Sequence, residues 1–139
     1  GRYRSDCRVE NIRHDGSAFI AETKNVSFTA PKIVLACGHG ITKLAPMVGL
    51  DTPIVPQRGQ ILVTERAEPV LAMALSSVRQ TDEGTVQIGN TEEEVDFNDG
   101  TTLDAGQAMA RRAVTIFPQL AGLRLIRTWG CIRVLTPDK

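Results

Sequence analysis

The chain has 139 residues, 42% of them hydrophobic and 23% charged, and its 16 basic and 16 acidic residues give a formal net charge of zero. This composition is typical of a folded globular protein, and without an excess of lysine and arginine nucleic acid is excluded as the main partner. The sequence contains no run of about 18 apolar residues that could span a membrane, and its N-terminal stretch lacks the apolar segment of a signal peptide.

Three cysteines lie far apart in the sequence, at Cys7, Cys37 and Cys131. An odd number at this spacing fits neither a disulfide framework nor a zinc site, so we expect no metal. We interpret them as reduced thiols of a cytoplasmic protein, where they act as small buried hydrophobic residues. A catalytic cysteine would need a histidine base, and the sequence does not place His14 or His39 near any of them.

Short strands are predicted at the start of the chain. Residues 6–13 alternate apolar and polar side chains, HDG at 14–16 is a turn signal, and 18–23 returns from it, so the two strands form a hairpin. Residues 26–30 extend this sheet. Residues 32–37, KIVLAC, are apolar on both faces, which predicts a buried, parallel strand.

A glycine-rich turn, CGHG at 37–40, follows, and 41–50 then predicts a short helix that ends before Gly49. Residues 51–57 carry two prolines and have the composition of a crossover linker.

The second half of the chain is typical of an antiparallel sheet. Strands are predicted at 58–65, 71–81 and 85–91, with the turn DEG at 82–84 between the last two. The segment 92–102 is an acidic loop, and we expect its three consecutive glutamates to be solvated.

A helix and a last strand follow. Residues 103–120 place apolar side chains on one helical face, with Thr102 and Asp104 as candidate caps. Pro118 ends the helix. The last strand, 122–136, is predicted to be long and broken at a glycine, Gly130. These elements predict an α+β protein.

Four stretches follow one another along the chain: APKIVLACGHGITKLAPMVGL (30–50), PIVPQRGQILVTE (53–65), GTVQIGNTEEEVDF (84–97) and RTWGCIRVLTPD (127–138). In this order they resemble the middle of the FAD-dependent oxidoreductases of the D-amino acid oxidase type, which include glycine oxidase, sarcosine oxidase and the flavin subunits of opine and D-hydroxyproline dehydrogenases.

The resemblance implies a domain organisation. Residues 1–52 correspond to part of an FAD-binding α/β domain, 53–128 to an antiparallel substrate-binding domain with one covering helix, and 129–139 to a strand that returns towards the FAD domain. The family's GxGxxG fingerprint normally lies before this region and a glycine-rich flavin segment lies after it. We therefore expect an internal fragment that holds FAD poorly by itself and self-associates through the exposed strand 32–37.

The resemblance also implies site residues. Arg133 would bind the substrate carboxylate, because guanidinium pairs with carboxylate through two hydrogen bonds. The small residues Ala36, Cys37 and Gly38 would lie against the FAD, and the backbone at Val9 would meet its adenine ring. No residue is assigned an acid–base role, because an amine that binds in its neutral form can give up hydride directly.

Alternatives remain open at these positions. Arg133 could be a surface arginine at a strand end or could pair with Asp138. The family commonly has proline where this chain has Val134, so the local turn need not be shared. His39, where the family often has alanine, could lie near a phosphate or be a solvated turn residue. Val9 is the weakest of the assignments, since a backbone contact leaves little mark on side-chain identity.

Two further stretches have a structural interpretation beside the functional one. We interpret Arg58 and Gln60 as a structural hydrogen-bonding pair, and we expect Gly59 between them to relieve crowding. Trp129 could line the flavin pocket, although core packing is the usual role of a single tryptophan. Many family members carry a tyrosine in the substrate pocket, and this chain has SSVRQT in the corresponding stretch.

The function implied by the resemblance is oxidation in amino-acid catabolism, with hydride transfer from Cα–H to FAD. The substrate would be a small amino acid or secondary amine such as a D-amino acid, glycine, sarcosine, an opine or hydroxyproline. The electron acceptor, oxygen or a partner subunit, is open, and other subunits of a heteromeric dehydrogenase are candidate partners. The alternative is a non-enzymatic α+β domain that binds a ligand or another subunit.

Overall fold

The structure is a computed structural model that describes residues 1–138. The chain forms two compact units: Gly1–Val55 with Val134–Lys139, and Pro56–Arg133. No helix among the described residues is long and apolar enough to cross a membrane.

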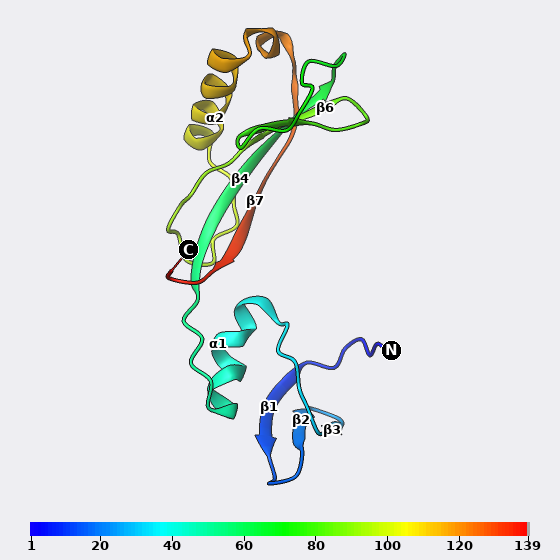
Figure 1. Ribbon diagram of the computed structural model, residues 1–139. Coiled ribbons are helices and arrows are strands. Elements are labelled where there is room, and N and C mark those ends of the chain that lie inside the picture. The colour runs from blue at the N-terminus through cyan, green and yellow to red at the C-terminus, as the bar shows by residue number, and fades with distance from the viewer. Residues whose placement is uncertain (139) are drawn as a thin grey trace. The chain divides into compact units, whose positions relative to one another are not determined.

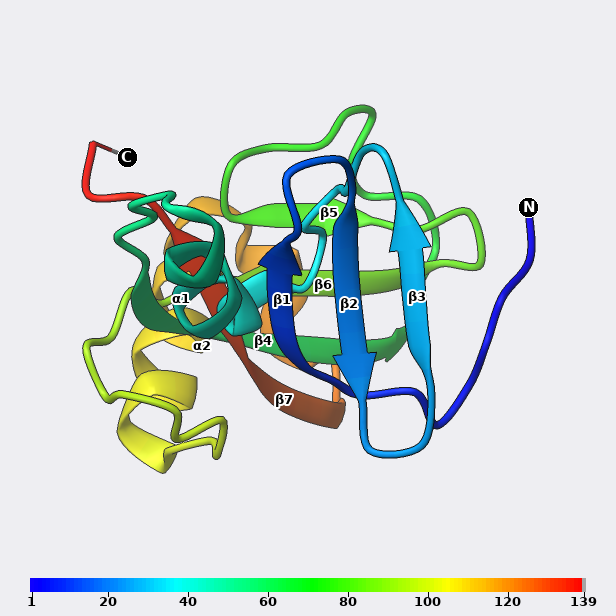
Figure 2. The same ribbon diagram turned by 90° about the horizontal axis from the view of Figure 1, so that it is seen from below.

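The first unit contains a three-stranded antiparallel sheet in the order β1-β2-β3, built from Val9–His14, Phe19–Thr23 and Ser27–Ala30 (Figure 2). In the β1–β2 turn, one carboxylate oxygen of Asp15 accepts hydrogen bonds from the backbone N–H groups of Ser17 and Ala18, each 2.9 Å long. These bonds explain why HDG forms a turn. The predicted hairpin and its third strand are confirmed.

A helical segment follows the sheet and packs against β1. It consists of a 3-10 turn at Gly38–Gly40, the helix α1 at Ile41–Leu44 and a second 3-10 turn at Ala45–Val48. Gly49 ends it in the left-handed conformation, with φ at 76°, which glycine adopts without steric cost. The predicted helix and its end before Gly49 are confirmed.

The predicted buried strand at residues 32–37 is wrong. These residues belong to no strand, and the Val34 side chain is 86% exposed. A buried parallel strand needs hydrogen-bonding neighbours and cover on both faces. In the described part of the first unit, the strands β1, β2 and β3 pair with one another and not with this segment.

The second unit contains a four-stranded sheet in the order β5-β6-β4-β7, built from Val55–Arg66 (β4), Val78–Gln80 (β5), Thr85–Gly89 (β6) and Leu125–Leu135 (β7) (Figure 2). Strand β6 pairs antiparallel with both β4 and β5. The strand predicted at 71–81 is shorter in the structure, because only three residues of β5 find partners on the five-residue β6.

Strand β7 lies along β4 in the opposite direction. Arg124, just before β7, donates its backbone N–H and guanidinium to the Glu65 carboxylate near the end of β4, whereas Arg133 near the end of β7 lies at Gly59 near the start of β4. The strand is continuous through Gly130, so the predicted break there is wrong. A Cβ at Gly130 would collide with the backbone carbonyl of Asp99, so glycine lets a loop cross the strand.

One helix, α2 at Leu103–Ile116, covers one face of this sheet (Figure 1). It ends before Pro118, where Phe117 leaves the helical conformation with φ at −127° and ψ at 83°, because a following proline disfavours the helical region for the residue before it. The buried core lies between helix and sheet and consists of Leu62, Val78, Val86, Ile88, Met109, Ala113 and Leu120. The α+β class, with an antiparallel sheet and one covering helix, is confirmed.

We expect Met109→Ala to lower the free energy of unfolding of the full-length protein by about 2 to 5 kcal/mol, because it leaves a cavity in this core. Met109 is 2% exposed, whereas Met73 is 71% exposed, which makes Met73→Ala a matched control. The control should change stability by about 0.5 kcal/mol or less. Urea unfolding followed by circular dichroism measures both, and equal losses would contradict the assigned core.

Candidate functional site

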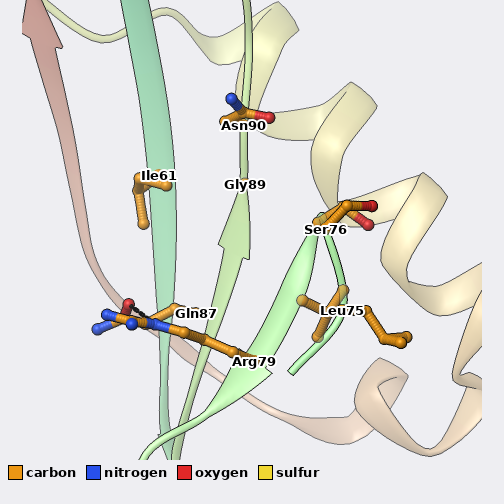
Figure 3. Close-up of a pocket in the computed structure, with 9 residues that line it drawn as sticks. Ile61, Leu75, Ser76, Arg79, Gln87, Gly89 and Asn90 are labelled. Carbon is orange, nitrogen blue, oxygen red and sulfur yellow. Dashed lines mark hydrogen bonds between the residues drawn. The ribbon is translucent and has the colours of Figure 1, made fainter. Parts of the chain in front are cut away.

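The sheet of the second unit has an open face opposite α2. Side chains alternate along a strand, so Leu62, which faces the core, leaves Ile61 on the open face, and Ile88 leaves Gln87 there. On this face Arg79 donates from Nε to the amide oxygen of Gln87 at 2.8 Å. A cavity of about 250 Å³ lies here (Figure 3), lined by Ile61, Leu75, Ser76, Ser77, Val78, Arg79, Gln87, Gly89 and Asn90.

Arg133 lies on the same face, over Gly59. A Cβ built on Gly59 would come within 2.8 Å of the Arg133 Nε atom, so the absent side chain leaves the space that the guanidinium occupies. The guanidinium donates a hydrogen bond to the backbone carbonyl of Thr91. Its acidic neighbour is Glu92, whose carboxylate oxygen is 3.9 Å from the Arg133 Nη1 atom. The expectation that Gly59 relieves crowding is therefore confirmed, with Arg133 as the group that needs the space.

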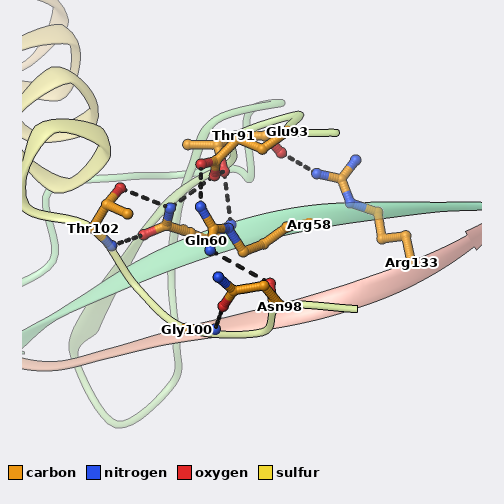
Figure 4. Close-up of polar contacts among 8 residues, drawn as sticks. All are labelled: Arg58, Gln60, Thr91, Glu93, Asn98, Gly100, Thr102 and Arg133. Carbon is orange, nitrogen blue, oxygen red and sulfur yellow. Dashed lines mark hydrogen bonds and ion pairs between the residues drawn. The ribbon is translucent and has the colours of Figure 1, made fainter. Parts of the chain in front are cut away.

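A buried ion pair lies on the other side of β4. The guanidinium of Arg58, 5% exposed, donates to a carboxylate oxygen of Glu93 at 2.7 Å (Figure 4). The two backbones are also joined, since Arg58 N–H donates to the Glu93 carbonyl at 2.8 Å and Glu93 N–H donates back at 3.0 Å. The second carboxylate oxygen accepts from the Gln60 amide at 2.7 Å and from the Thr91 hydroxyl at 2.5 Å. Arg58 and Gln60 thus have a structural role, as predicted, but through a shared partner, Glu93.

Gln60 also joins this cluster to the start of α2. Its amide oxygen accepts the backbone N–H of Thr102 at 2.9 Å, and its amide nitrogen donates to the Thr102 hydroxyl at 3.1 Å. Thr102 occupies the N-cap position but makes no side-chain capping bond. The sequence therefore identified the cap position, and the polar partner there comes from β4, 42 residues earlier in the chain.

Glu93 is not solvated in the way predicted for the three consecutive glutamates of the acidic loop. Its side chain is 24% exposed, whereas that of Glu92 is 63% exposed. The hydrogen bond from Arg58 lowers the pKa of Glu93 from 4.5 to about 2, against the opposing effect of burial and with further help from Thr91 and Gln60. Glu93 is the member of this site that the sequence analysis missed, because its position within a run of glutamates carries no signal.

The residues predicted to contact the cofactor lie in the first unit. Val9 begins β1 and is half-buried, Ala36 and Cys37 are exposed, and Gly38 opens the 3-10 turn with φ at 56°. Small exposed side chains and a left-handed glycine fit a turn that a flat cofactor approaches through the backbone. The flavin contacts of these four residues stay predictions, as does the carboxylate contact of Arg133.

Two other predictions are corrected. Cys37 and Cys131 are exposed and Cys7 is half-buried, so the cysteines are not core residues. Cys37 lies in a turn, Cys131 in the edge strand β7 and Cys7 in the segment before β1. Trp129 is half-buried outside the core, with the Arg127 guanidinium 5.3 Å from its ring centre, which fits a cation–π contact rather than core packing.

Comparison with known proteins agrees with this architecture. The pattern of the DAO family, FAD dependent oxidoreductase, matches residues 1–139. An opine oxidase subunit of Rhizobium meliloti is 38% identical over 136 residues, which cover 98% of this chain and 37% of the relative. Glycine oxidase of Pseudomonas putida is 26% identical over 140 residues, covering 97% of this chain and 38% of that protein.

Solved structures show the same fold. The crystal structure of glycine oxidase from Geobacillus kaustophilus superimposes with a TM-score of 0.83 at 24% identity, over 94% of this chain and 37% of that one. L-proline dehydrogenase from P. horikoshii also gives 0.83, at 21% identity, over 94% of this chain and 38% of that one.

The chain therefore belongs to the FAD-dependent oxidoreductase family, whose cofactor is FAD. It spans little more than a third of the length of the curated relatives it matches. The predicted resemblance and the predicted cofactor are confirmed.

The Glu93 pKa predicts how stability depends on pH. Because the folded-state pKa, about 2, lies below the ordinary 4.5, the ion pair contributes its full stability above about pH 4.5 and loses it as the pH falls towards 2. We expect Glu93→Gln to make the unfolding free energy of the full-length protein fall less steeply between about pH 6 and about pH 3. Urea titrations across this range measure the slope.

Glu94→Gln is the matched control, since Glu94 is an exposed glutamate in the same run. It should keep the wild-type slope. If both variants titrate like the wild type, the assigned ion pair does not set the acid sensitivity of this region.

Proposed function

We propose that the full-length protein oxidises a small amino acid or secondary amine by hydride transfer to FAD, and that Arg133 binds the carboxylate of that substrate. The substrates we propose are D-amino acids, glycine, sarcosine, opines and hydroxyproline. One observation carries the proposal: in a chain of this family, the Arg133 guanidinium lies over Gly59 on the open sheet face, and Ile61, two residues further along β4, lines a cavity on that face.

The environment of Arg133 suits a carboxylate anchor. Its side chain is 30% exposed, so part of the guanidinium is accessible while the Thr91 carbonyl holds another part. Arginine stays charged at any physiological pH and offers a planar fork of five N–H donors. A carboxylate bound by that fork has a fixed orientation, which fixes the Cα–H bond to be broken and lowers the entropic part of the barrier.

FAD supplies the hydride acceptor when it is bound. What this chain contributes is binding and orientation. The cavity lined by Ile61, Ser76 and Ser77 offers space for the group on the amine nitrogen or on Cα. The two serines occupy the stretch where many family members carry a tyrosine, and their small side chains leave more room for such a group.

The names of two relatives support a heteromeric enzyme. The opine oxidase protein of Rhizobium meliloti and the hydrogen cyanide synthase protein of Pseudomonas protegens, 38% and 30% identical to this chain, are both described as subunits. We propose that the full-length protein likewise works with other subunits and passes electrons to one of them rather than to oxygen.

The test is anaerobic reduction of the flavin in the full-length protein. With proline, hydroxyproline, sarcosine, glycine or an opine added, we expect one of them to bleach the flavin absorbance. Arg133→Ala should lower kcat/KM for it by a factor of about 100 or more, because a carboxylate loses its charged partner. Arg133→Lys keeps the charge but loses the planar fork of donors, so its kcat/KM should lie between those of the wild type and Arg133→Ala. A flavin that no amine bleaches would remove this substrate class, and a protein without flavin would favour the non-enzymatic alternative.

Gly59→Ala should disturb the anchor without unfolding the protein. The added methyl group would displace the Arg133 guanidinium, the mobile end of a long side chain, and a misplacement of about 1 Å can cost up to about 100-fold in rate. Flavin reduction rates at varied substrate concentration measure this loss. Gly122→Ala is the control, because nothing lies within 4 Å of a Cβ at Gly122. Unchanged kinetics in Gly59→Ala would show that the guanidinium position is not critical.

A further inference from the structure

We propose that Glu93, acting through Thr91, is a positioning residue for Arg133. This inference rests on the proposed function, because it concerns how Arg133 is held to bind the substrate carboxylate. The contacts run from Arg58 to Glu93, from Glu93 to Thr91 and from Thr91 to Arg133 (Figure 4).

The first link is the fixed position of Glu93. Its carboxylate accepts three side-chain hydrogen bonds, from Arg58 at 2.7 Å, from Gln60 at 2.7 Å and from Thr91 at 2.5 Å. Its backbone is joined to Arg58 in both directions. A carboxylate held on both oxygens by donors from a regular strand has a single orientation, so it can fix its neighbours.

The second link is Thr91. Its hydroxyl donates to Glu93 and accepts the backbone N–H of Gln60 at 3.0 Å. Both capacities of the hydroxyl are therefore used, and both partners belong to the cluster around β4. The residue follows the end of β6, where the ladder no longer fixes the backbone. The direction of the Thr91 carbonyl thus depends on these two side-chain bonds.

The third link is the bond from the Arg133 guanidinium to that carbonyl. An arginine side chain on an edge strand has many rotamers, and holding it in one of them costs conformational entropy. The space over Gly59 admits the guanidinium, and the Thr91 carbonyl selects its orientation. Because the Arg133 side chain is already ordered before the substrate binds, the substrate carboxylate binds a pre-oriented guanidinium.

Glu92 is the other acidic residue near Arg133, and it is a weaker candidate for this role. It lies 3.9 Å from the guanidinium with 63% of its side chain exposed. Exposed pairs at this distance contribute little and are screened by salt. The route through Thr91 consists of direct, partly buried hydrogen bonds, so it carries the positioning.

The variant that isolates this route is Thr91→Val in the full-length holoenzyme. Valine has nearly the shape of threonine and keeps the backbone carbonyl, but it removes the hydroxyl bonds to Glu93 and Gln60. We expect a loss of about tenfold in kcat/KM for an amino-acid substrate, the size of a net hydrogen bond. Thr91→Ser, which keeps the hydroxyl, should stay within about twofold of the wild type.

A double-mutant cycle separates positioning from a general structural role. In the Arg133→Ala background, Thr91→Val should cause no further loss, because the group it positions is gone. Glu93→Gln should show the same dependence on Arg133, while Glu94→Gln, an exposed neighbour in the same run, should change nothing. An equal loss from Thr91→Val with and without Arg133 would overturn the proposal.

A second readout does not depend on activity. In ¹⁵N-arginine NMR spectra of the full-length protein, the Arg133 Nε–H signal is assigned by its loss in Arg133→Lys. Its order parameter should be high, as expected for an immobilised guanidinium. Thr91→Val should lower that order, and Thr91→Ser should not. An unchanged order parameter for Arg133 Nε–H in Thr91→Val would overturn the positioning role, whether or not the protein reduces its flavin with an amine. Lowered order in a protein that oxidises no amine would support the contact route and reject the proposed function alone.

Discussion

The ion pair between Arg58 and Glu93 is the constraint on which the second unit depends. Removing two charges from water is costly, and their attraction offsets that cost only when further hydrogen bonds satisfy them. Gln60 and Thr91 bond Glu93, and the Asn98 carbonyl lies 3.4 Å from the Arg58 guanidinium. Because all of these partners are needed together, the acidic loop between β6 and α2 has little freedom along β4. An apolar pair could stabilise the sheet as well, but it would not dictate where this loop lies.

The tripeptide Arg58-Gly59-Gln60 serves both faces of the sheet because side chains alternate along a strand. Arg58 and Gln60 point to the side of α2, where they hold Glu93 and the start of the helix. Gly59 points to the open face, where its missing side chain admits the Arg133 guanidinium. The same three residues thus join the stability of the loop to the geometry of the proposed anchor. A change that relaxes one of these faces is felt on the other through the backbone.

The parts of the fold that the sequence predicted are those that depend on local chemistry. The turn after β1 follows from Asp15 bonding the next backbone N–H groups, and the end of the helical segment follows from the left-handed Gly49. The strand expected at residues 32–37 failed because periodicity reports apolar character, not whether a neighbouring strand is present. Glu93 was missed for a similar reason: its partner Arg58 lies 35 residues earlier, and nothing in a run of three glutamates marks the middle one.

Val134, the residue that follows Arg133, bears on how Arg133 is held. Strand β7 continues through Val134 to Leu135, so Arg133 lies within a strand rather than at a turn. A proline fixes its own φ angle and restricts the residue before it, and a valine imposes neither restriction. Backbone regularity and the Thr91 carbonyl must therefore set the direction of the guanidinium in this chain. The orientation of the Arg133 guanidinium would therefore be decided by a contact from a loop distant in sequence, at Thr91, and not by the local sequence around Arg133.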